Sequence, residues 1–294
     1  MKPIKNWSDL ERRFTPFIEK GLVELLPEKS SYTKKFDSAL HYSLTSSGKR
    51  IRPLLFIAVF LALKKKIEKS ELEKIVAFAC GIEYIHNYSL VHDDIMDKDE
   101  LRRGAETVWK KFGAETAILV GDALLTKGLG ILYANYYSGA LFLNRNVGAP
   151  GMISGQAADI ECEGKSASSY GEDALWYIHG HKTAAFFSGV CGAAAVAAGQ
   201  GKAILLKFAD FGFYTGGAFQ LTDDILDETG SAQYQKSRYD KRNEKLTALK
   251  YFSVGEAQGL VEELFQEAED ILLGIPCSRN VLKEIIDLLR KRKK

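Results

Sequence analysis

The sequence predicts an all-α protein, and three observations lead to that prediction. Apolar residues recur at spacings of three and four along most of the 294 residues, as on the buried face of a helix. The chain has only 6 prolines, so long segments remain free to form helices. No convincing alternation of apolar and polar residues indicates a β-hairpin. With 46% hydrophobic residues and no evident linker, we expect one domain over residues 1–294.

Spacing places five helices in the first half of the chain. They cover residues 10–22, 36–44, 54–63, 71–92 and 116–137. The second helix is expected to end before Gly48. Pro53 is tolerated in a first helical turn and marks the start of the third helix. Residues 99–104 are expected to form a charged turn.

In the second half, Asn144, Asn146 and Pro150 predict a break across residues 138–151. Helices are expected over residues 152–161, 170–199 and 208–226. The polar stretch 230–244 predicts a loop, and three short helices are expected after it.

Charge and cysteine content exclude several classes of protein. A formal net charge of +2 gives no support for nucleic-acid binding. The four cysteines form no CxxC pair, which favours reduced thiols in a cytoplasmic protein. The N-terminus lacks the apolar core of a signal peptide. The best apolar run, residues 54–63, is too short to span a bilayer, so no transmembrane segment is expected.

Two aspartate-rich clusters of the same pattern are the most informative part of the sequence. Residues 93–97 read Asp-Asp-Ile-Met-Asp, and residues 223–227 read Asp-Asp-Ile-Leu-Asp. On a helix, the first and last acids of each cluster share a face. So many like charges are unfavourable unless cations compensate them, and Mg²⁺ suits such oxygen ligands. Two facing clusters would hold a metal–diphosphate group between them.

Basic residues near the first cluster predict an anion site. His86 lies two helical turns before Asp93, and the pair Arg102-Arg103 follows the acids. Guanidinium groups would bind phosphate oxygens that a metal leaves free. Lys49 and Arg52, at a helix start, can bind one anion together. Weaker candidates for the site are Gln156, Asp159, Lys182, Thr183, Lys236 and Lys245. For each residue taken alone, a solvated charge or a buried polar pair is the alternative interpretation.

Together these residues make the chain resemble the trans-isoprenyl diphosphate synthases of the polyprenyl synthetase family. The motifs that carry the resemblance stand in the family's order and span most of the chain. They are Gly48-Lys49-Arg50-Ile51-Arg52-Pro53, residues 90–97 with Leu101-Arg102-Arg103-Gly104, Gly121-Asp122-Ala123-Leu124, residues 151–159, His181-Lys182-Thr183 and residues 219–227.

The resemblance implies an isoprenoid synthase type I fold, which is one large bundle of helices around a central cavity, and usually a homodimer. It implies a prenyltransferase of isoprene biosynthesis that condenses an allylic diphosphate with isopentenyl diphosphate, using three Mg²⁺ ions. By similarity, the metal ligands are Asp93, Asp97 and Asp223, with Asp94, Asp224 and Asp227 in support. The allylic diphosphate would be held by Arg102, Lys182, Thr183, Gln220, Lys236 and Lys245. Isopentenyl diphosphate would be held by Lys49, Arg52, His86 and Arg103.

Product length is expected to depend on Tyr88 and Ser89, about one turn before Asp93. The bulky Tyr88 would form the floor of the cavity and favour a short product, farnesyl or geranylgeranyl diphosphate. The first acidic cluster lacks a two-residue insertion common in bacterial farnesyl enzymes, which tilts the prediction toward geranylgeranyl diphosphate. A core aromatic without a gating role is the alternative for Tyr88. The segments near 138–150, 199–208 and 230–244 are shorter than in the family or depart from its pattern.

The same residues argue against other functions. A class I terpene cyclase needs no second substrate site, and a non-catalytic partner subunit should have lost metal-binding acids, whereas all six are present. No heptad pattern persists to support a coiled coil. The basic tail 290–294 fits a solvated helix end better than a membrane-binding segment.

Overall fold

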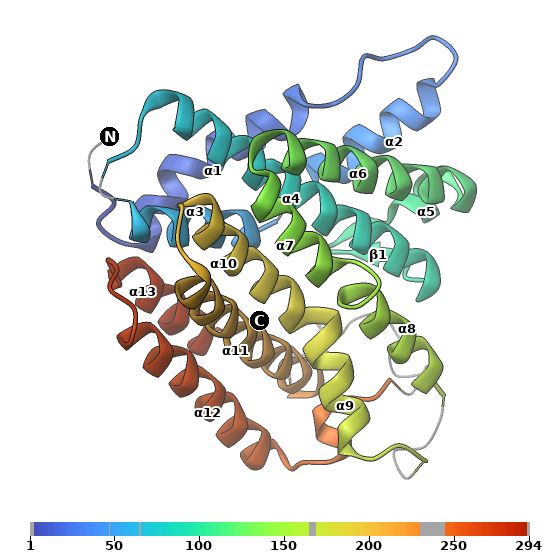
Figure 1. Cartoon of the computed structure of the whole chain (residues 1–294). Helices are drawn as coiled ribbons and strands as arrows, with labels where there is room; N and C mark the ends of the chain where they lie inside the picture. Colours follow the sequence, from blue (N-terminus) through green and yellow to red (C-terminus); the bar gives the residue numbers. More distant parts are fainter. Residues whose placement is uncertain (1–2, 47, 65, 165–168, 230–244, 293–294) are drawn as a thin grey trace. The chain divides into compact units, whose positions relative to one another are not determined.

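The computed structural model describes residues 3–46, 48–64, 66–164, 169–229 and 245–292 (Figure 1). The predicted all-α class is confirmed, because most of these residues are helical. The α-helices are α1 (Trp7–Glu24), α2 (Lys34–Thr45), α3 (Ile51–Leu63), α4 (Lys69–Met96), α5 (Val108–Phe112), α6 (Ala114–Asn135), α7 (Tyr137–Val147), α8 (Met152–Cys162), α9 (Glu172–Ile178), α10 (Ala185–Ala197), α11 (Lys202–Thr229), α12 (Val254–Leu273) and α13 (Asn280–Arg290). The remaining elements are the π-helical turn η2 (His179–Ala184), the 3-10 turn η3 (Ala248–Lys250), and strands β1 (Leu101–Arg102) and β2 (Ala105–Glu106).

The chain divides into two compact units. The first contains Met1–Pro3, Ser8–Ile57 and Lys66–Tyr137, and the second contains Ile4–Trp7, Ala58–Lys65 and Ser138–Lys294. The first acidic cluster therefore belongs to the first unit and the second cluster to the second unit.

In the first unit, α4 packs along α6 because small residues let the two backbones approach (Figure 1). A Cβ on Gly81 of α4 would lie 2.9 Å from a methyl of Leu132 and 3.2 Å from the carbonyl oxygen of Gly128. A Cβ on Gly128 of α6 would lie 2.9 Å from Ile85 Cγ1. Any side chain at either glycine would push the helices apart. The long helix α4, which carries the first acidic cluster, is thus held against α6 by close packing of the two backbones.

Aromatic side chains fix α4 against the other helices of this unit. Tyr84 is fully buried, and its hydroxyl donates to the carbonyl oxygen of Leu22 at 2.9 Å. Phe78 stacks on Phe56 of α3, with ring centroids 4.6 Å apart. A buried tyrosine needs such a hydrogen-bond partner, and stacked rings add to the area that they bury.

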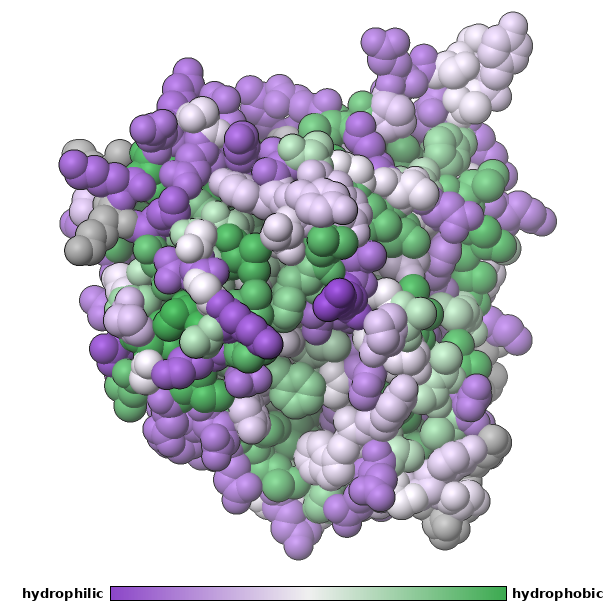
Figure 2. Space-filling view, in the orientation of Figure 1, coloured by the Kyte–Doolittle hydropathy of each residue, from purple (hydrophilic) through white to green (hydrophobic). Residues whose placement is uncertain are grey.

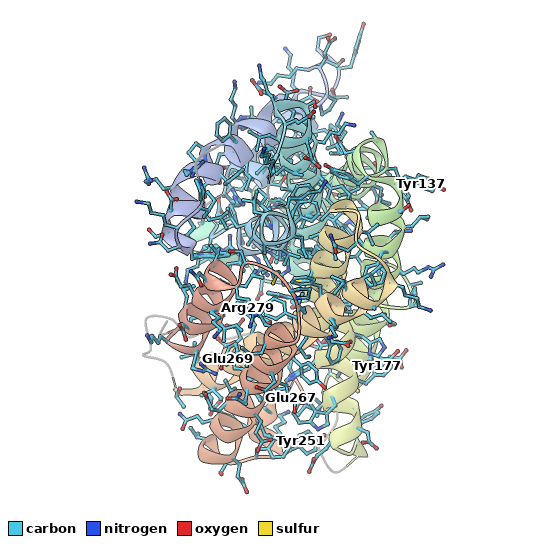
Figure 3. All side chains as sticks on the ribbon, turned by 60° about the vertical axis from the view of Figure 1, so that its left-hand side comes forward. Tyr137, Tyr177, Tyr251, Glu267, Glu269 and Arg279 are labelled. Atoms are coloured by element: carbon cyan, nitrogen blue, oxygen red, sulfur yellow. The ribbon has the colours of Figure 1, made fainter. Side chains whose placement is uncertain are left out.

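In the second unit, α11 packs against α10 and α12. Gly212 and Gly216 of α11 lie against Phe187 of α10, where an added Cβ would come within 2.5 Å of the Phe187 carbonyl oxygen or 2.9 Å of its Cβ. Helix α12 begins at a capping box, in which Ser253 and Glu256 exchange hydrogen bonds with each other's backbone N–H. One side of α12 buries Phe265, whereas Glu267 is exposed (Figure 3).

Four predictions about elements were wrong or incomplete. Residues 138–151 are mostly helix α7, because the Asn146 side chain donates to the Phe142 carbonyl within the helix, and the break begins only at Gly148. The chain ends with one long helix, α12, before the shorter α13, rather than with three short helices. The expected charged turn is present at Arg103-Gly104, but it joins two short strands, β1 and β2, in a hairpin that was not expected. The predicted helix 170–199 is interrupted by η2. The predicted loop 230–244 lies outside the described residues.

Candidate active site

The first acidic cluster occupies the C-terminal end of α4 in the first unit. The helix continues to Met96, and the backbone N–H of Asp97 still donates to the Asp93 carbonyl at 2.8 Å. Asp93 and Asp97 therefore share a helical face, as their spacing predicted. Asp97 is buried and Asp93 is half-buried.

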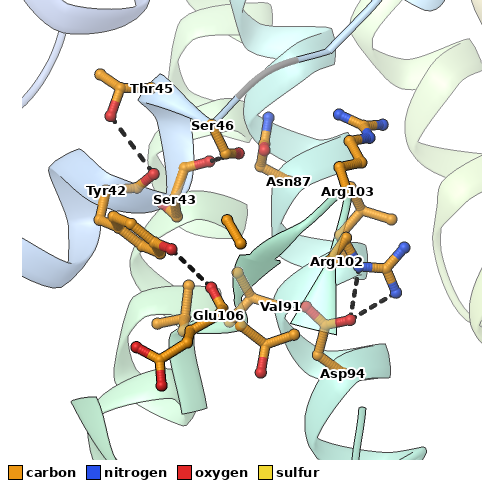
Figure 4. A pocket seen from close by; sticks show the side chains of 14 residues that line it. Tyr42, Ser43, Thr45, Ser46, Asn87, Val91, Asp94, Arg102, Arg103 and Glu106 are labelled. Carbon is orange, nitrogen blue, oxygen red and sulfur yellow. Dashed lines mark hydrogen bonds and ion pairs between the residues drawn. The ribbon is translucent and has the colours of Figure 1, made fainter. Parts of the chain in front are cut away.

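Asp94 is buried and bound within the protein. The Nε and Nη2 atoms of Arg102 both donate to Asp94 Oδ1, at 2.6 and 2.5 Å (Figure 4). Burial raises the pKa of Asp94 to about 6, although the Arg102 charge opposes the rise. Asp94 and Arg102 thus form a largely buried ion pair beside the cluster.

The β1–β2 hairpin holds Arg102 and Arg103 at this end of α4. Its two-residue turn is Arg103-Gly104, with φ values of +54° and +80°. Two consecutive positive φ angles define the turn that best suits a tight hairpin. The hairpin is tied to α5 because Thr107 Oγ1 and Trp109 Nε1 both donate to the Asp99 carbonyl at 2.7 Å.

A cavity of about 130 Å³ lies behind the ion pair (Figure 4). Its wall includes Asp94, Arg102 and Arg103. It also includes Asn87 and Val91 of α4. These residues of α4 lie on a different face from Asp93 and Asp97. Leu90 also lines the cavity and lies three residues before Asp93 and seven before Asp97, so the cavity borders the face that carries the candidate metal ligands.

His86 lies among arginines in the same unit. Its pKa is well below the ordinary histidine value because of burial and then the charges of Arg52, Arg103, Arg102 and Arg50. Burial, followed by the charge of Arg102, also lowers the pKa of Arg103. The structure therefore gathers Arg52, His86 and Arg103, three of the four residues predicted to hold isopentenyl diphosphate. The fourth, Lys49, is exposed.

Arg50 has a structural role that sequence reasoning missed. Its side chain is only 2% exposed, and it binds Glu19 Oε1 and Glu83 Oε1 at 2.7 Å each. It also donates to the carbonyl oxygens of Leu44 and Ser46. Arg50 has a φ of +48°, which is uncommon for a residue with a side chain. These contacts fix the Gly48–Arg50 turn, where a Cβ on Gly48 would lie 2.7 Å from Arg103 Nη1.

The two candidate chain-length residues differ in their surroundings. Tyr88 is 8% exposed, and its ring meets the His92 ring edge-on, with centroids 5.3 Å apart. Ser89 is half-buried, and its hydroxyl donates to the His86 carbonyl at 2.8 Å.

The second acidic cluster lies near the C-terminal end of α11 in the second unit. Asp224 is buried there and fully engaged. It accepts from Gln220 Nε2 at 3.0 Å and from the backbone N–H of Ala248 at 2.8 Å. His179 Nε2 lies 3.2 Å from its Oδ2.

The outer acids of this cluster are half-buried. Asp223 pairs with Arg292 at 2.8 Å, and the Arg292 guanidinium lies 4.4 Å from the Phe219 ring centroid. The basic tail is thus partly paired rather than fully solvated. Arg290 also pairs with Glu262 and Glu269.

The turn η2 gathers polar residues predicted for the allylic site. Lys182 Nζ binds Asp159 Oδ2 at 2.5 Å, and Thr183 donates to Gln220 Oε1 at 2.7 Å. Burial by itself would raise the pKa of Asp159, but the charges of Lys182 and Lys245 outweigh it and leave the pKa below its ordinary value. A Cβ on Gly155 would lie 2.1 Å from the Lys182 backbone nitrogen, so α8 and η2 are in backbone contact.

Gln156 and Lys236 are the remaining residues predicted for this site. In the part of the chain that the structure describes, neither polar atom of the buried Gln156 amide has a hydrogen-bond partner. Such a group is costly to bury, which suits a polar ligand. Lys236 lies outside the described residues.

The second aspartate of each cluster, Asp94 or Asp224, is buried and bound by protein groups. In the second cluster, Asp223 is bound as well, by Arg292. Among the described residues, no three Asp, Glu, His or Cys side chains converge as a metal cage. Mg²⁺ does not need one, since it commonly binds one or two carboxylates together with substrate phosphates. The carboxylates of Asp93 and Asp97 in the first unit, and that of Asp223 in the second, are each the kind of oxygen ligand that Mg²⁺ takes.

Known proteins resemble this chain over nearly its whole length. The chain is 32% identical to the farnesyl diphosphate synthase of Bacillus subtilis, covering 96% of this chain and 99% of the relative. It is 35% identical to large subunit 1 of the chloroplastic heterodimeric geranylgeranyl pyrophosphate synthase of Arabidopsis thaliana, covering 87% and 71%.

Solved structures show the same fold. An FPP/GFPP synthase from Zymomonas mobilis has a TM-score of 0.82 at 27% identity, covering 96% of this chain and 98% of that one. A geranyltransferase from Helicobacter pylori, complexed with magnesium and isoprenyl diphosphate, has a TM-score of 0.80 at 28% identity, covering 99% and 96%. The sequence model described as polyprenyl synthetase matches residues 33–272, and the chain belongs to the polyprenyl synthetase family.

Proposed function

We propose that this chain is a short-chain trans-prenyltransferase that joins an allylic diphosphate to isopentenyl diphosphate. The observation that carries the proposal is the arginine cluster around His86 at the acidic end of α4. Arginines grouped around His86 favour the binding of an anion, and the carboxylates at the end of α4 favour the binding of a cation. A metal-bound diphosphate satisfies both groups at once.

In the proposed reaction, the allylic C–O bond breaks and pyrophosphate leaves with the bonding electrons. Bound Mg²⁺ supplies Lewis-acid stabilisation of that leaving group. Lys182 and Arg102 add positive charge beside it. The double bond of isopentenyl diphosphate then forms the new C–C bond to the allylic cation. Loss of a proton to the released pyrophosphate restores a double bond, so no covalent enzyme intermediate is needed.

Hydrogen bonds in the second unit prepare the allylic diphosphate site. Asp159 holds Lys182 through a hydrogen bond of 2.5 Å, which fixes the ammonium group beside α8. Thr183 and Gln220 bind each other and are held beside Asp224. We assign the allylic diphosphate to these residues with Arg102, Lys236 and Lys245, and isopentenyl diphosphate to Lys49, Arg52, His86 and Arg103.

We further propose that the enzyme is a homodimer and that α6 contributes to the interface. Ile118 and Leu119 of α6 are 47% and 58% exposed, and Figure 2 shows apolar side chains at the surface in the region of α6. Apolar exposure of this kind is typical of a protein interface. Among the described residues, α6 is the only helix long and apolar enough to cross a membrane by length and composition, a criterion that core helices also meet.

Three further proposals concern the domain organisation, the number of metal ions and the location of the enzyme. We propose that residues 1–294 act as one domain, that three Mg²⁺ ions bind with the diphosphate, and that the enzyme is cytoplasmic. All four cysteines are free, which agrees with a reducing compartment. A terpene cyclase would use only one diphosphate and would leave the arginine cluster around His86 without a substrate.

The direct test is incubation of the protein with labelled isopentenyl diphosphate, Mg²⁺ and dimethylallyl, geranyl or farnesyl diphosphate, followed by sizing of the products. We expect elongated diphosphates that stop at the farnesyl or geranylgeranyl length. Asp93→Ala should lower turnover by about 100-fold or more while the circular dichroism spectrum is unchanged. Unchanged starters in every reaction would refute the proposal, and near-normal turnover of Asp93→Ala would refute the metal assignment.

A further inference from the structure

His92 stands between the candidate chain-length residue Tyr88 and helix α6. It follows Tyr88 by one helical turn, so both side chains project from the same face of α4. The two rings meet edge to face, with an interplanar angle of 79°. This arrangement is a favoured one for aromatic rings, and it restricts both side chains. The position of the Tyr88 ring therefore depends on where His92 is held.

Helix α6 holds His92 in a socket that exists only because residue 121 is glycine. A Cβ on Gly121 would lie 2.0 Å from His92 Nε2 and 2.3 Å from its Cδ2. No real Cβ approaches that closely, so any side chain at this position would expel the imidazole ring. The socket is far tighter than the contacts made by Gly81 and Gly128 elsewhere between α4 and α6.

Polar contacts fix the ring inside the socket. His92 Nε2 lies 3.2 Å from the carbonyl oxygen of Ile118. Because a carbonyl only accepts hydrogen bonds, Nε2 carries the hydrogen in this contact. Asp122 Oδ1 lies 3.9 Å from the same nitrogen. Burial, and then the charges of Asp93 and Asp122, raise the pKa of Tyr88.

We propose that His92 and Gly121 are specificity-determining positioning residues, which hold the Tyr88 ring where it stops the growing isoprenoid tail. The inference rests on the proposed elongation activity and deepens it. His92 acts through Tyr88 and does not touch the reacting atoms. When the socket no longer holds His92, the Tyr88 ring can rotate about its Cα–Cβ bond, and the isoprenoid tail can extend past it.

Product length is the decisive measurement, compared among the wild type, His92→Ala, Tyr88→Ala and the double variant. We expect His92→Ala to raise the share of products longer than the main wild-type product by roughly two- to tenfold, the range set by one aromatic pair. The double variant should match Tyr88→Ala, because a residue that acts only through Tyr88 has no effect once Tyr88 is gone. Thr126→Ala is the matched control on α6, since its exposed hydroxyl binds only carbonyls of its own helix.

A second measurement tests the socket without any activity. Gly121→Ala should lower the thermal unfolding midpoint when His92 is present, and much less in a His92→Ala background where the added methyl has room. Equal destabilisation in both backgrounds would overturn the socket. Unchanged product lengths in His92→Ala or in Tyr88→Ala, or a further shift in the double variant, would overturn the positioning role. A wild type that forms no elongated product would refute the proposed function itself.

Discussion

The buried pair between Arg50 and Glu83 gives a strong prediction about stability. Both side chains are at most 3% exposed, and Arg50 Nη1 lies 2.7 Å from Glu83 Oε1. Removing one partner of a buried ion pair costs about 3–5 kcal/mol, because the other charge stays buried without compensation. We therefore expect Arg50→Met to lower the free energy of unfolding by about 3–5 kcal/mol.

Glu83→Gln should cost less, about 1.5–3 kcal/mol, since Arg50 keeps its hydrogen bonds to Glu19 and to two carbonyls. Replacing both partners by methionine should recover much of the loss in Arg50→Met, because neither charge then remains buried. Lys20→Ala is the control, since Lys20 pairs with Glu24 on the surface of α1 and is worth less than about 0.5 kcal/mol. Urea unfolding followed by circular dichroism measures all four variants.

The pH dependence of Arg50→Met gives an independent check. Burial raises the pKa of Glu83, and Arg50 opposes that rise, so the variant should have a still higher pKa at Glu83. A carboxyl whose folded pKa exceeds its unfolded value contributes stability below the unfolded pKa, and this contribution is lost as the pH rises through the folded pKa. Relative to the wild type, Arg50→Met should therefore lose less stability near pH 5 than near pH 8. An equal loss at both values, or a loss no larger than that of Lys20→Ala, would refute the reasoning.

Two further predictions concern the allylic site and the interface. Lys182→Met should raise the KM for the allylic diphosphate and lower turnover by about tenfold or more, because a charge beside the leaving group is lost; an unchanged KM for both substrates would remove Lys182 from the site. The double change Ile118→Asp and Leu119→Asp should convert a dimer into monomers in sedimentation velocity runs, because like charges would face each other across an apolar contact; a dimer that persists at micromolar concentration would place the interface elsewhere.

Local patterns in the sequence predicted the helices and the faces that carry the acids. The spacing of Asp93 and Asp97 requires a shared face once α4 is a helix, and α4 does extend to Met96. The hairpin escaped prediction because its strands have two residues each, and its turn uses Arg103-Gly104 rather than a strong turn pair such as Asn-Gly. Asn144 and Asn146 predicted a break, but the Asn146 side chain donates a hydrogen bond to the Phe142 carbonyl within α7, so the helix continues.

The partners that bind the charged residues of the site are distant in the sequence, so the spacing of residues does not reveal them. Arg50 pairs with Glu19, which lies 31 positions earlier in the chain, and with Glu83, which lies 33 positions later. Asp224 is held by His179 and Ala248, which belong to other elements. Similarly, η2 replaces regular helix where Gly155 brings α8 against the backbone of Lys182. Short-range periodicity carries no information about such pairs, so the sequence identified the acids without showing which protein groups bind them.

The ion pair between Arg292 and Asp223 leads to a prediction about metal affinity. Asp223 is a candidate metal ligand, and the Arg292 guanidinium lies 2.8 Å from its Oδ1 while packing on Phe219. A metal ion and this guanidinium compete for the same carboxylate. With side chains 19% and 25% exposed, the pair is worth about 1 kcal/mol, which corresponds to roughly a fivefold change in a dissociation constant.

Arg292→Ala should therefore tighten Mn²⁺ binding by roughly fivefold, as measured by electron paramagnetic resonance of the free ion in the absence of substrate. Lys291→Ala removes the same charge from an exposed neighbouring position and controls for the general field of the basic tail. If the two variants tighten binding equally, the effect is long-range electrostatics, and direct competition at Asp223 is refuted. A selective effect of Arg292→Ala would identify Asp223 as a carboxylate that the metal must take from the C-terminal tail. The tail would then set the Mg²⁺ concentration at which the second acidic cluster is filled.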